Sequence, residues 1–531
     1  MPTDERDNGA SEKGLNTPDE RTDTPPGAAR LKSGQQAVLV IFAFSSFMVV
    51  LDTASLPIPL PSMLHDLGGA LDAITWVFGA FILAFAISLL PFARLADTYD
   101  RRRLFLAGGM VFASGSLVAA LAPSMSYLIG ALAIQGIGAA MLEPAARAVI
   151  RSTFSPEQHR VAFGMQRASV FVGAALGPIL SGCITTVFSW RYLFWLNLLL
   201  AATVVAGAVL LLPASRASQT GRRFDLPGLL LGAPGLFFLM FPLIEGARLG
   251  WRSPAVVGSF VLSGILLALF VVTERQVRDP LAPLMLFHDR LFAVGNMLRG
   301  VTEFASLGVF FVLSHFLQVQ LGYSALVTGL LLMSIIGGAL VTSPIAEALV
   351  GRVDVRWLVI PGFVLVAMGT FWVAHVSPET GWVFFIAPLA VAGAGFGALE
   401  SPTTSAMQRH IMPAQEEAAW RVSYTVYLLG IGLGVAVVSA VWQNQLVEYV
   451  HETLFRINLP PAMVNRFVSS VLAGGSRGSG TAYIEALIQQ AFAHAINAAL
   501  LSCVAVAVLG AIVALFFSSG QVHGNNGTNV E

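Results

Sequence analysis

A few charged residues of this 531-residue chain lie inside long apolar runs, where their types and spacing allow specific chemistry. They are Asp52, the pair Glu143 and Arg147, and the pair Arg299 and Glu303. In an apolar medium a carboxylate takes up a proton more readily than in water, so it can bind and release protons near neutral pH. An arginine four residues from a glutamate shares its helix face and can neutralise it. The spacing therefore predicts proton binding, with structural ion pairs as the alternative.

The composition shows what must surround these charges. Hydrophobic residues make up 56% of the chain, charged residues make up 11%, and the mean hydropathy is +0.74. Soluble domains carry roughly 25% charged residues. Apolar runs long enough to cross a hydrocarbon core of about 30 Å recur along the whole length. The sequence therefore predicts an all-α membrane protein.

About fourteen spanning helices are expected from these runs. The predicted spans are 37–58, 74–93, 104–122, 127–149, 163–188, 192–213, 226–246, 254–273, 292–317, 325–349, 357–376, 382–407, 422–443 and 490–517. Most of the 30 basic residues fall in alternate loops, on the side of the N-terminus. Loops rich in arginine and lysine stay in the cytoplasm, so both termini are predicted to be cytoplasmic.

The spans group into two halves joined by a linker. The predicted parts are a disordered cytoplasmic tail (1–35), an N-terminal six-helix half (36–213), two linker helices (214–290), a C-terminal six-helix half (291–518) with an extracytoplasmic loop (444–489), and a cytoplasmic tail (519–531). The first tail is polar and rich in Pro, Gly and Asp, and it has no apolar core with a cleavage site, so it is not read as a signal peptide.

An internal repeat supports this division. "ARLADTYDRRRLFLAG" (93–108) aligns with "EALVGRVDVRWLVIPG" (347–362) without gaps, and "QGIGAAMLEP" (135–144) is similar to "GAGFGALESP" (393–402). Two similar halves related by an axis along the membrane normal are typical of transporters.

The first of these segments is unusually charged. A cluster of arginines that only orients the chain is one explanation. The stretch also resembles the loop signature G-x-L-a-D-r-x-G-R-R of the major facilitator superfamily, in its fourteen-helix drug:proton antiporter branch, although Ala93 and Asp100 replace the two glycines. The resemblance covers nearly all of residues 36–518. It implies a cytoplasmic latch that binds in one transport state and releases in the other, formed by Arg94, Asp97, Arg101 and Arg102.

Other segments carry the same resemblance. They are "FMVVLDTASLPIPLP", "GAALGPILSG", "SWRYLFWLNL" with the pattern W-R-x-x-F-x-x-N, "FLQVQLGYSALVTGL", and "VWQNQLVEYVHETL". The second is similar to the antiporter motif of the fifth helix, whose residues here are Gly173, Gly177, Pro178 and Gly182. Its glycines predict close helix packing and its proline a bend, with ordinary small-residue packing as the alternative.

The resemblance to the family's acidic position implies that Asp52 is the main proton-coupling residue. Glu143 and Glu303 depart from the family's pattern and are further candidate carboxylates for proton coupling. An aspartate that caps a helix near the outer interface is the alternative for Asp52. Glu143 and Glu303 each have an arginine one turn away that would favour their charged form. The family's usual arginine before the Gln of "QGIGAA" is Leu132 here.

A substrate cavity is predicted around the remaining polar residues of the spans: Arg147, Arg167, Arg299, His315 and Gln318. Arginines could pair with a carboxylate and so indicate an anionic or zwitterionic substrate. Four acidic residues, Asp52, Glu143, Glu303 and Glu400, could cancel these charges. Arg421 opens the thirteenth span, where it could also lie at the inner interface.

The function implied is a secondary transporter of the bacterial inner membrane that exports small molecules, such as drugs, in exchange for protons by alternating access. A dedicated exporter or importer of one anionic or zwitterionic metabolite, and a non-transporting sensor or scaffold, are the alternatives. An enzyme is not expected, because the only lysines, Lys13 and Lys32, lie in the tail and cannot form a P-loop. No cofactor, metal or nucleic acid is expected. The lipid bilayer, protons and a small molecule are the expected partners, and a periplasmic adaptor with an outer-membrane channel stays open.

Overall fold

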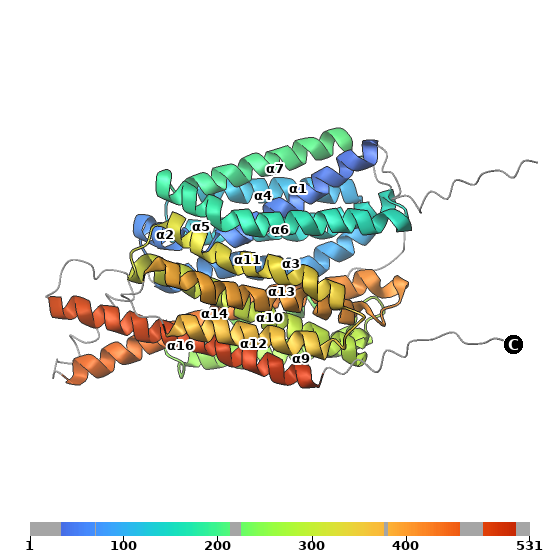
Figure 1. The fold of residues 1–531 in the computed structure, drawn as a ribbon. Coiled ribbons are helices and arrows are strands. Elements are labelled where there is room, and N and C mark those ends of the chain that lie inside the picture. Colours follow the sequence, from blue (N-terminus) through green and yellow to red (C-terminus); the bar gives the residue numbers. More distant parts are fainter. Residues whose placement is uncertain (1–32, 70, 213–224, 376–380, 457–481, 517–531) are drawn as a thin grey trace, which may run out of the picture.

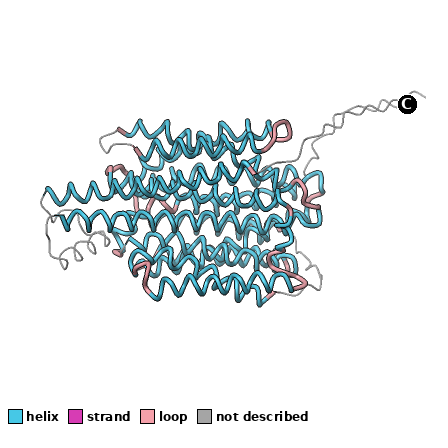
Figure 2. The backbone as a smooth tube through the Cα atoms, turned by 90° about the horizontal axis from the view of Figure 1, so that it is seen from below, coloured by secondary structure: helices cyan, strands magenta, loops and turns pink. Residues whose placement is uncertain are grey.

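The computed structural model describes residues 33–69, 71–212, 225–375, 381–456 and 482–516. Residues 1–32 of the predicted tail 1–35 and the whole predicted tail 519–531 lie outside the described residues, and residues 33–35 belong to the first helix. The described chain is helical, with one isolated β-bridge between Val350 and Val353. The helices run along one direction and the loops gather at two ends (Figure 2). Fourteen of the helices in the described residues are long and apolar enough to cross a membrane, which confirms the predicted number.

The helices occur in three groups along the chain. The N-terminal half comprises α1 (Ser33–Ser55), α2 (Leu60–Leu67), α3 (Leu71–Thr98), α4 (Arg101–Ala120), α5 (Met125–Thr153), α6 (Pro156–Val187) and α7 (Arg191–Leu211). The linker helices are α8 (Leu226–Leu249) and α9 (Pro254–Gln276). The C-terminal half comprises α10 (Arg290–His315), α11 (Ala325–Leu349), α12 (Arg356–Ala374), α13 (Ile386–Gln408), α14 (Glu416–Arg456) and α16 (Ala482–Leu515). Short turns lie at Leu284–His288 (η1), Phe316–Gln320 (η2), Trp382–Phe385 (η3) and Pro413–Gln415 (η4).

Helix α1 begins and helix α16 ends on the same side of the bundle (Figure 1). We call this side the terminal face and the other side the opposite face. Helices α3, α5 and α13 end at the terminal face, and α14 begins there.

The internal repeat has a three-dimensional counterpart in the packing of α4 on α5 and of α12 on α13. A Cβ on Gly115 would meet the backbone of Ala131 and Gln135, and a Cβ on Gly369 would meet the backbone of Pro388 and Ala392. Both aligned segments also begin a helix in the same way. Asp100 accepts a hydrogen bond from the N–H of Arg102 at 3.0 Å, and Asp354 accepts one from the N–H of Arg356 at 3.2 Å. The aspartate that replaces a family glycine is therefore the N-cap of α4.

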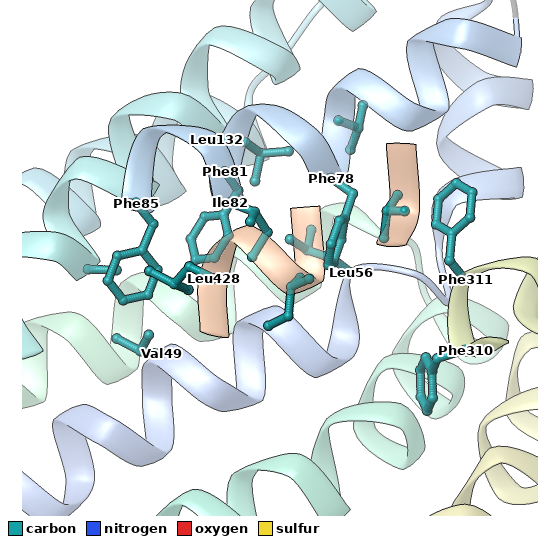
Figure 3. Packing of buried hydrophobic residues seen from close by; sticks show 14 of the residues in the cluster. Val49, Leu56, Phe78, Phe81, Ile82, Phe85, Leu132, Phe310, Phe311 and Leu428 are labelled. Carbon is teal, nitrogen blue, oxygen red and sulfur yellow. The ribbon is translucent and has the colours of Figure 1, made fainter. Parts of the chain in front are cut away.

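The two halves meet around an apolar core. Phe78 and Phe81 of α3, Leu428 of α14 and Phe311 of α10 belong to one buried cluster, part of which Figure 3 shows. Leu132 is also in this cluster and is fully buried. The side chain that stands at the position of the family's usual arginine is therefore part of the apolar core.

The linker helix α8 covers the line of contact between α3 and α14. Its Met240 and Ile244 pack with Leu83 of α3 and Ala436 of α14. Helix α9 is mostly exposed, because only 17% of the residues in its most apolar 18-residue stretch are buried. This exposure is expected of a helix that faces lipid. The linker therefore contacts both halves.

One predicted boundary is wrong. The thirteenth span was expected at 422–443 with a loop from 444, but α14 continues as a helix to Arg456. Its 41 residues correspond to about 60 Å, twice the thickness of the hydrocarbon core. The end of α14 and the start of α16 project beyond the other helices on the left of Figure 1. The predicted extracytoplasmic loop is therefore helical at both ends, and residues 457–481 lie outside the described residues.

Candidate functional site

Ion pairs join the two halves at the terminal face. The Arg421 guanidinium of α14 donates to the Asp97 carboxylate of α3 at 2.6 Å, and the Arg421 side chain is only 7% exposed. Arg94 of α3 is equally buried and pairs at 3.0 Å with Asp279, which follows α9. The predicted latch thus has two residues, Arg94 and Asp97, that bind outside the N-terminal half.

The other two predicted latch residues do not bind across the halves. Arg102 donates to the carbonyl oxygen of Val209 in α7 at 2.7 Å, within its own half. Arg101 forms no ion pair within the described part of the chain. Both residues begin α4, and neither is paired across the halves in this conformation, so their part in the latch stays a prediction.

A second group of ion pairs lies beside the first and joins α5 to α14. Arg147 reaches Glu417 at 3.3 Å. Arg151 reaches Glu417 at 3.1 Å and Glu416 at 3.0 Å. We call these ion pairs, together with those of Arg421 and Arg94, the terminal-face gate.

Aromatic rings hold Arg147 in this position. Its guanidinium carbon lies 4.6 Å from the ring centroid of Phe163 in α6 and 4.7 Å from that of Trp420 in α14. Arg147 was expected to pair with Glu143 on its own helix, but that ion pair does not form. Glu143 is 6% exposed and interacts instead with the Ser46 hydroxyl of α1, which also accepts a hydrogen bond from Gln166.

The second predicted pair, Arg299 and Glu303, is confirmed at 3.3 Å, and Arg299 also binds Glu400 of α13 at 2.9 Å. The guanidinium of Arg299 lies over the ring of Tyr427, 5.0 Å from its centroid. Tyr427 stacks in turn on Tyr424, and Tyr424 on Trp420, with centroids 5.3 Å apart in both cases. An aromatic row on α14 therefore runs between the two arginines, Arg147 and Arg299.

Asp52 lies elsewhere, near the opposite face in α1, and is 1% exposed. The amide group of Asn197 in α7 donates a hydrogen bond to one of its carboxylate oxygens, and the other oxygen has no hydrogen-bond partner in the described structure. The side chain therefore does not cap α1 from solvent. Burial without a cation is the property required of a proton site.

The W-R-x-x-F-x-x-N pattern builds the surroundings of Asp52. Trp190 donates to Asp66 at 2.9 Å, Arg191 donates to the carbonyl of Ala122 at 2.9 Å, and the fourth residue of the pattern is Asn197. The motif is visible in the sequence, but nothing in the sequence pairs its asparagine with Asp52.

The antiporter motif of α6 packs on two helices. Gly173 and Gly177 lie against the backbone of α1, where a Cβ would meet Phe47 and Leu51. Gly182 lies against α11 of the other half, where a Cβ on it would come within 2.5 Å of the carbonyl oxygen of Ala325. Gly329 of α11 lies in turn against the carbonyl oxygen of Pro178. The motif thus brings the halves together near the opposite face, and its glycines pack closely, as their spacing predicts.

Hydrogen bonds close the opposite face as well. Ser314 donates to the carbonyl of Pro57 at 2.8 Å, and Gln318 donates to that of Ile58 at 2.8 Å. His315, also predicted for the cavity, packs instead on Trp442 of α14, with ring centroids 4.6 Å apart. Arg167 is exposed on α6. Neither His315 nor Arg167 therefore lies with the ion pairs of Arg147 and Arg299.

Sequence reasoning missed several residues of the site: Ser46, Asn197, Asp279, Glu416, Glu417, Tyr424 and Tyr427. Acidic residues at the start of a helix are common, so Glu416 and Glu417 carried no special signal. The stacked rings follow i, i+4 and i, i+3 spacing on one helix, which the sequence does display.

Comparisons with known proteins agree with this architecture. The sequence profile described as "Major Facilitator Superfamily" matches residues 42–435. The puromycin resistance protein of Streptomyces alboniger is 33% identical over 417 residues, which cover 78% of this chain and 82% of that protein. The cephamycin export protein of Amycolatopsis lactamdurans is 33% identical over 427 residues, which cover 78% and 86%.

Among solved structures, a bacterial homologue of the human lysosomal transporter Spinster, in an inward-facing and occupied conformation, matches with a TM-score of 0.62 and 17% sequence identity. The match covers 92% of this chain and 97% of that chain, so the fold is shared almost throughout. Profile, relatives and fold agree, and the chain is a multi-pass membrane protein that belongs to the Major Facilitator Superfamily.

Proposed function

We propose that this protein exports small molecules across the bacterial inner membrane in exchange for protons, by alternating access of its two halves. The observation that carries the proposal is the terminal-face gate, where buried ion pairs such as Asp97 with Arg421 join the halves. Ion pairs between rigid bodies can break and re-form, since water solvates the separated charges. Relatives named for puromycin resistance and cephamycin export support export as the direction.

Two buried carboxylates suit proton binding. Asp52 and Glu143 are 1% and 6% exposed, and neither forms an ion pair in the described structure. Glu303, in contrast, is held by Arg299. We therefore assign proton binding to Asp52, nearer the opposite face, and to Glu143, nearer the terminal face, and assign Glu303 with Arg299 to the substrate region.

The proposal of a dedicated carrier for one anionic metabolite is less well supported. It requires arginines that can bind a carboxylate. Arg147 is engaged by Glu417, and Arg299 is engaged by Glu303 and Glu400. Arg167 remains exposed on α6. Carboxylates of the protein thus already occupy two of the three candidate arginines.

The test of the function is efflux in a pump-deficient bacterial strain. Expression of the protein is expected to lower susceptibility to several toxic compounds, and a proton uncoupler should abolish the difference. In proteoliposomes, addition of an exported compound should release protons from the protein. Protection that survives the uncoupler would contradict proton coupling, and uniform susceptibility across a broad panel would contradict drug export.

The terminal face is proposed to be cytoplasmic, because most arginines and lysines lie in its loops. We expect a cysteine placed in the connection between α14 and α16, residues 457–481, to react with a membrane-impermeant reagent in intact cells. A cysteine beside Arg352, in a terminal-face loop, is expected to react only after permeabilisation. The reverse pattern would invert the topology.

A further inference from the structure

Arg147 lies between two carboxylates but binds only one of them. Glu143 lies one turn deeper in the same helix, so the two side chains share a face. Glu417 lies across the boundary between the halves and takes the guanidinium at 3.3 Å. Since Glu417 belongs to the C-terminal half, separation of α5 from α14 would remove it from Arg147.

The internal repeat supplies an independent comparison for Glu143. Gly173 and Gly177 of α6 lie against Phe47 and Leu51 of α1 in one half. Gly430 and Gly434 of α14 lie against Gly300 and Phe304 of α10 in the other half. This alignment of α1 with α10 places Ser46 where the C-terminal half has Arg299.

The same repeat aligns Glu143 with Glu400, through "MLEP" and "ALES". Glu400 is ion-paired with the guanidinium of Arg299 at 2.9 Å, whereas Glu143 forms no ion pair among the described residues and interacts with the hydroxyl of Ser46 and, at longer range, with the charge of Arg147. At equivalent positions, one carboxylate is therefore ion-paired within its own half and the other is not. Arg147 is the cation within reach of Glu143.

We propose that Arg147 exchanges partners during transport, binding Glu417 when the terminal-face gate is closed and Glu143 when it is open. The inference rests on the proposed proton antiport. With the gate closed, Arg147 is paired with Glu417, so Glu143 forms no ion pair and holds a proton. With the gate open, Arg147 stabilises the Glu143 carboxylate, and the proton passes to water on the cytoplasmic side. Opening the gate thus expels the proton.

The groups that face Glu143 from each neighbouring element are consistent with this exchange. They are Ser46 of α1, Arg147 of α5, and Tyr424 and Tyr427 of α14. The tyrosines are neutral at physiological pH, and the nearest carboxylate beyond them, Glu303, is neutralised by Arg299. Arg147 is therefore the group whose movement changes the charge beside Glu143. Phe163 and Trp420, which hold it over the gate, come from different halves and separate when the gate opens.

The experiment is the pH profile of substrate-induced proton release by the full chain in proteoliposomes. In Glu417→Gln, Arg147 is free to stay on Glu143 in every state, so the midpoint is expected to move to lower pH by about one unit or more. In Arg147→Gln, Glu143 lacks a cation in every state, so the midpoint is expected to move to higher pH and the release to shrink. Opposite shifts from the two partners of one ion pair are the signature of exchange.

Glu416→Gln is the matched control. Glu416 lies next to Glu417 and also joins the gate, but it pairs with Arg151 at 3.0 Å and not with Arg147. This variant is expected to retain the wild-type midpoint, whatever happens to its rate. Equal midpoints in wild type and Glu417→Gln, or shifts of the same sign in Glu417→Gln and Arg147→Gln, would overturn the exchange while leaving antiport intact. If the wild type itself releases no proton, proton antiport fails and the exchange fails with it.

Discussion

Asp97→Asn is expected to lower efflux about ten-fold or more while the protein still reaches the membrane. The change keeps the volume of the side chain but removes the charge that faces Arg421 at 2.6 Å. Arg421 is 7% exposed, so it would then be a buried cation without its carboxylate. Breaking a fully buried pair costs roughly 3–5 kcal/mol. The cost is smaller here, because Asp97 is 25% exposed, but even about 1.4 kcal/mol shifts a two-state equilibrium ten-fold.

The measurement is drug efflux at matched membrane abundance. Arg103→Gln is the control in the same stretch, since its side chain is 88% exposed and its one ion pair among the described residues is with Asp100, and it should retain wild-type efflux. The exchange of charges in Asp97→Arg with Arg421→Asp tests the pair directly and should recover part of the activity. Normal efflux by Asp97→Asn would show that the charged stretch serves only to orient the chain.

The membrane fold could be predicted because apolar length is a local property. The end of α14 is the exception, since a helix that leaves the bilayer loses the apolar signal. Leu446 and Val450 are buried and four residues apart, so helical periodicity did mark this extension. The predicted loop from 444 was placed where the apolar run ends.

The site could be predicted only in part, because its key contacts join distant segments. Asp97 and Arg421 are 324 residues apart, and no local sequence pattern shows that they form a pair. Arg147 illustrates a different limit. A helical glutamate–arginine pair contributes only about 0.2–0.5 kcal/mol, whereas a cation over aromatic rings gains about 0.5–2 kcal/mol with each ring. Phe163, Trp420 and Glu417 therefore outweigh the local partner, and local spacing alone gives the wrong ion pair.

Asp52→Asn is expected to bind and exchange substrate but to lose proton-driven efflux. Coupling requires a group that is charged in one state and neutral in another, and asparagine is neutral in every state. Its carbonyl oxygen can still accept the hydrogen bond from Asn197, so the fold around it should be preserved. We therefore expect the variant to reach the membrane in normal amounts but to lose the coupling of efflux to protons.

Two measurements on the same proteoliposomes separate these effects. Exchange of labelled for unlabelled substrate should continue in Asp52→Asn, because it needs only binding and alternating access. Substrate-induced proton release should fall, since one of the two proposed proton sites is gone. Asp66→Asn is the matched control, an aspartate near the same face that binds Trp190 and is 47% exposed, and it should release protons normally.

Glu303→Gln completes the comparison. Arg299 neutralises Glu303 in this structure, so its removal is expected to change which compounds are exported and to leave proton release in place. Undiminished release from Asp52→Asn, together with release lost in Glu303→Gln, would move the proton site into the charged cluster around Arg299. The buried aspartate of α1 would then be a structural acceptor for Asn197, and the unpaired second oxygen would need another explanation.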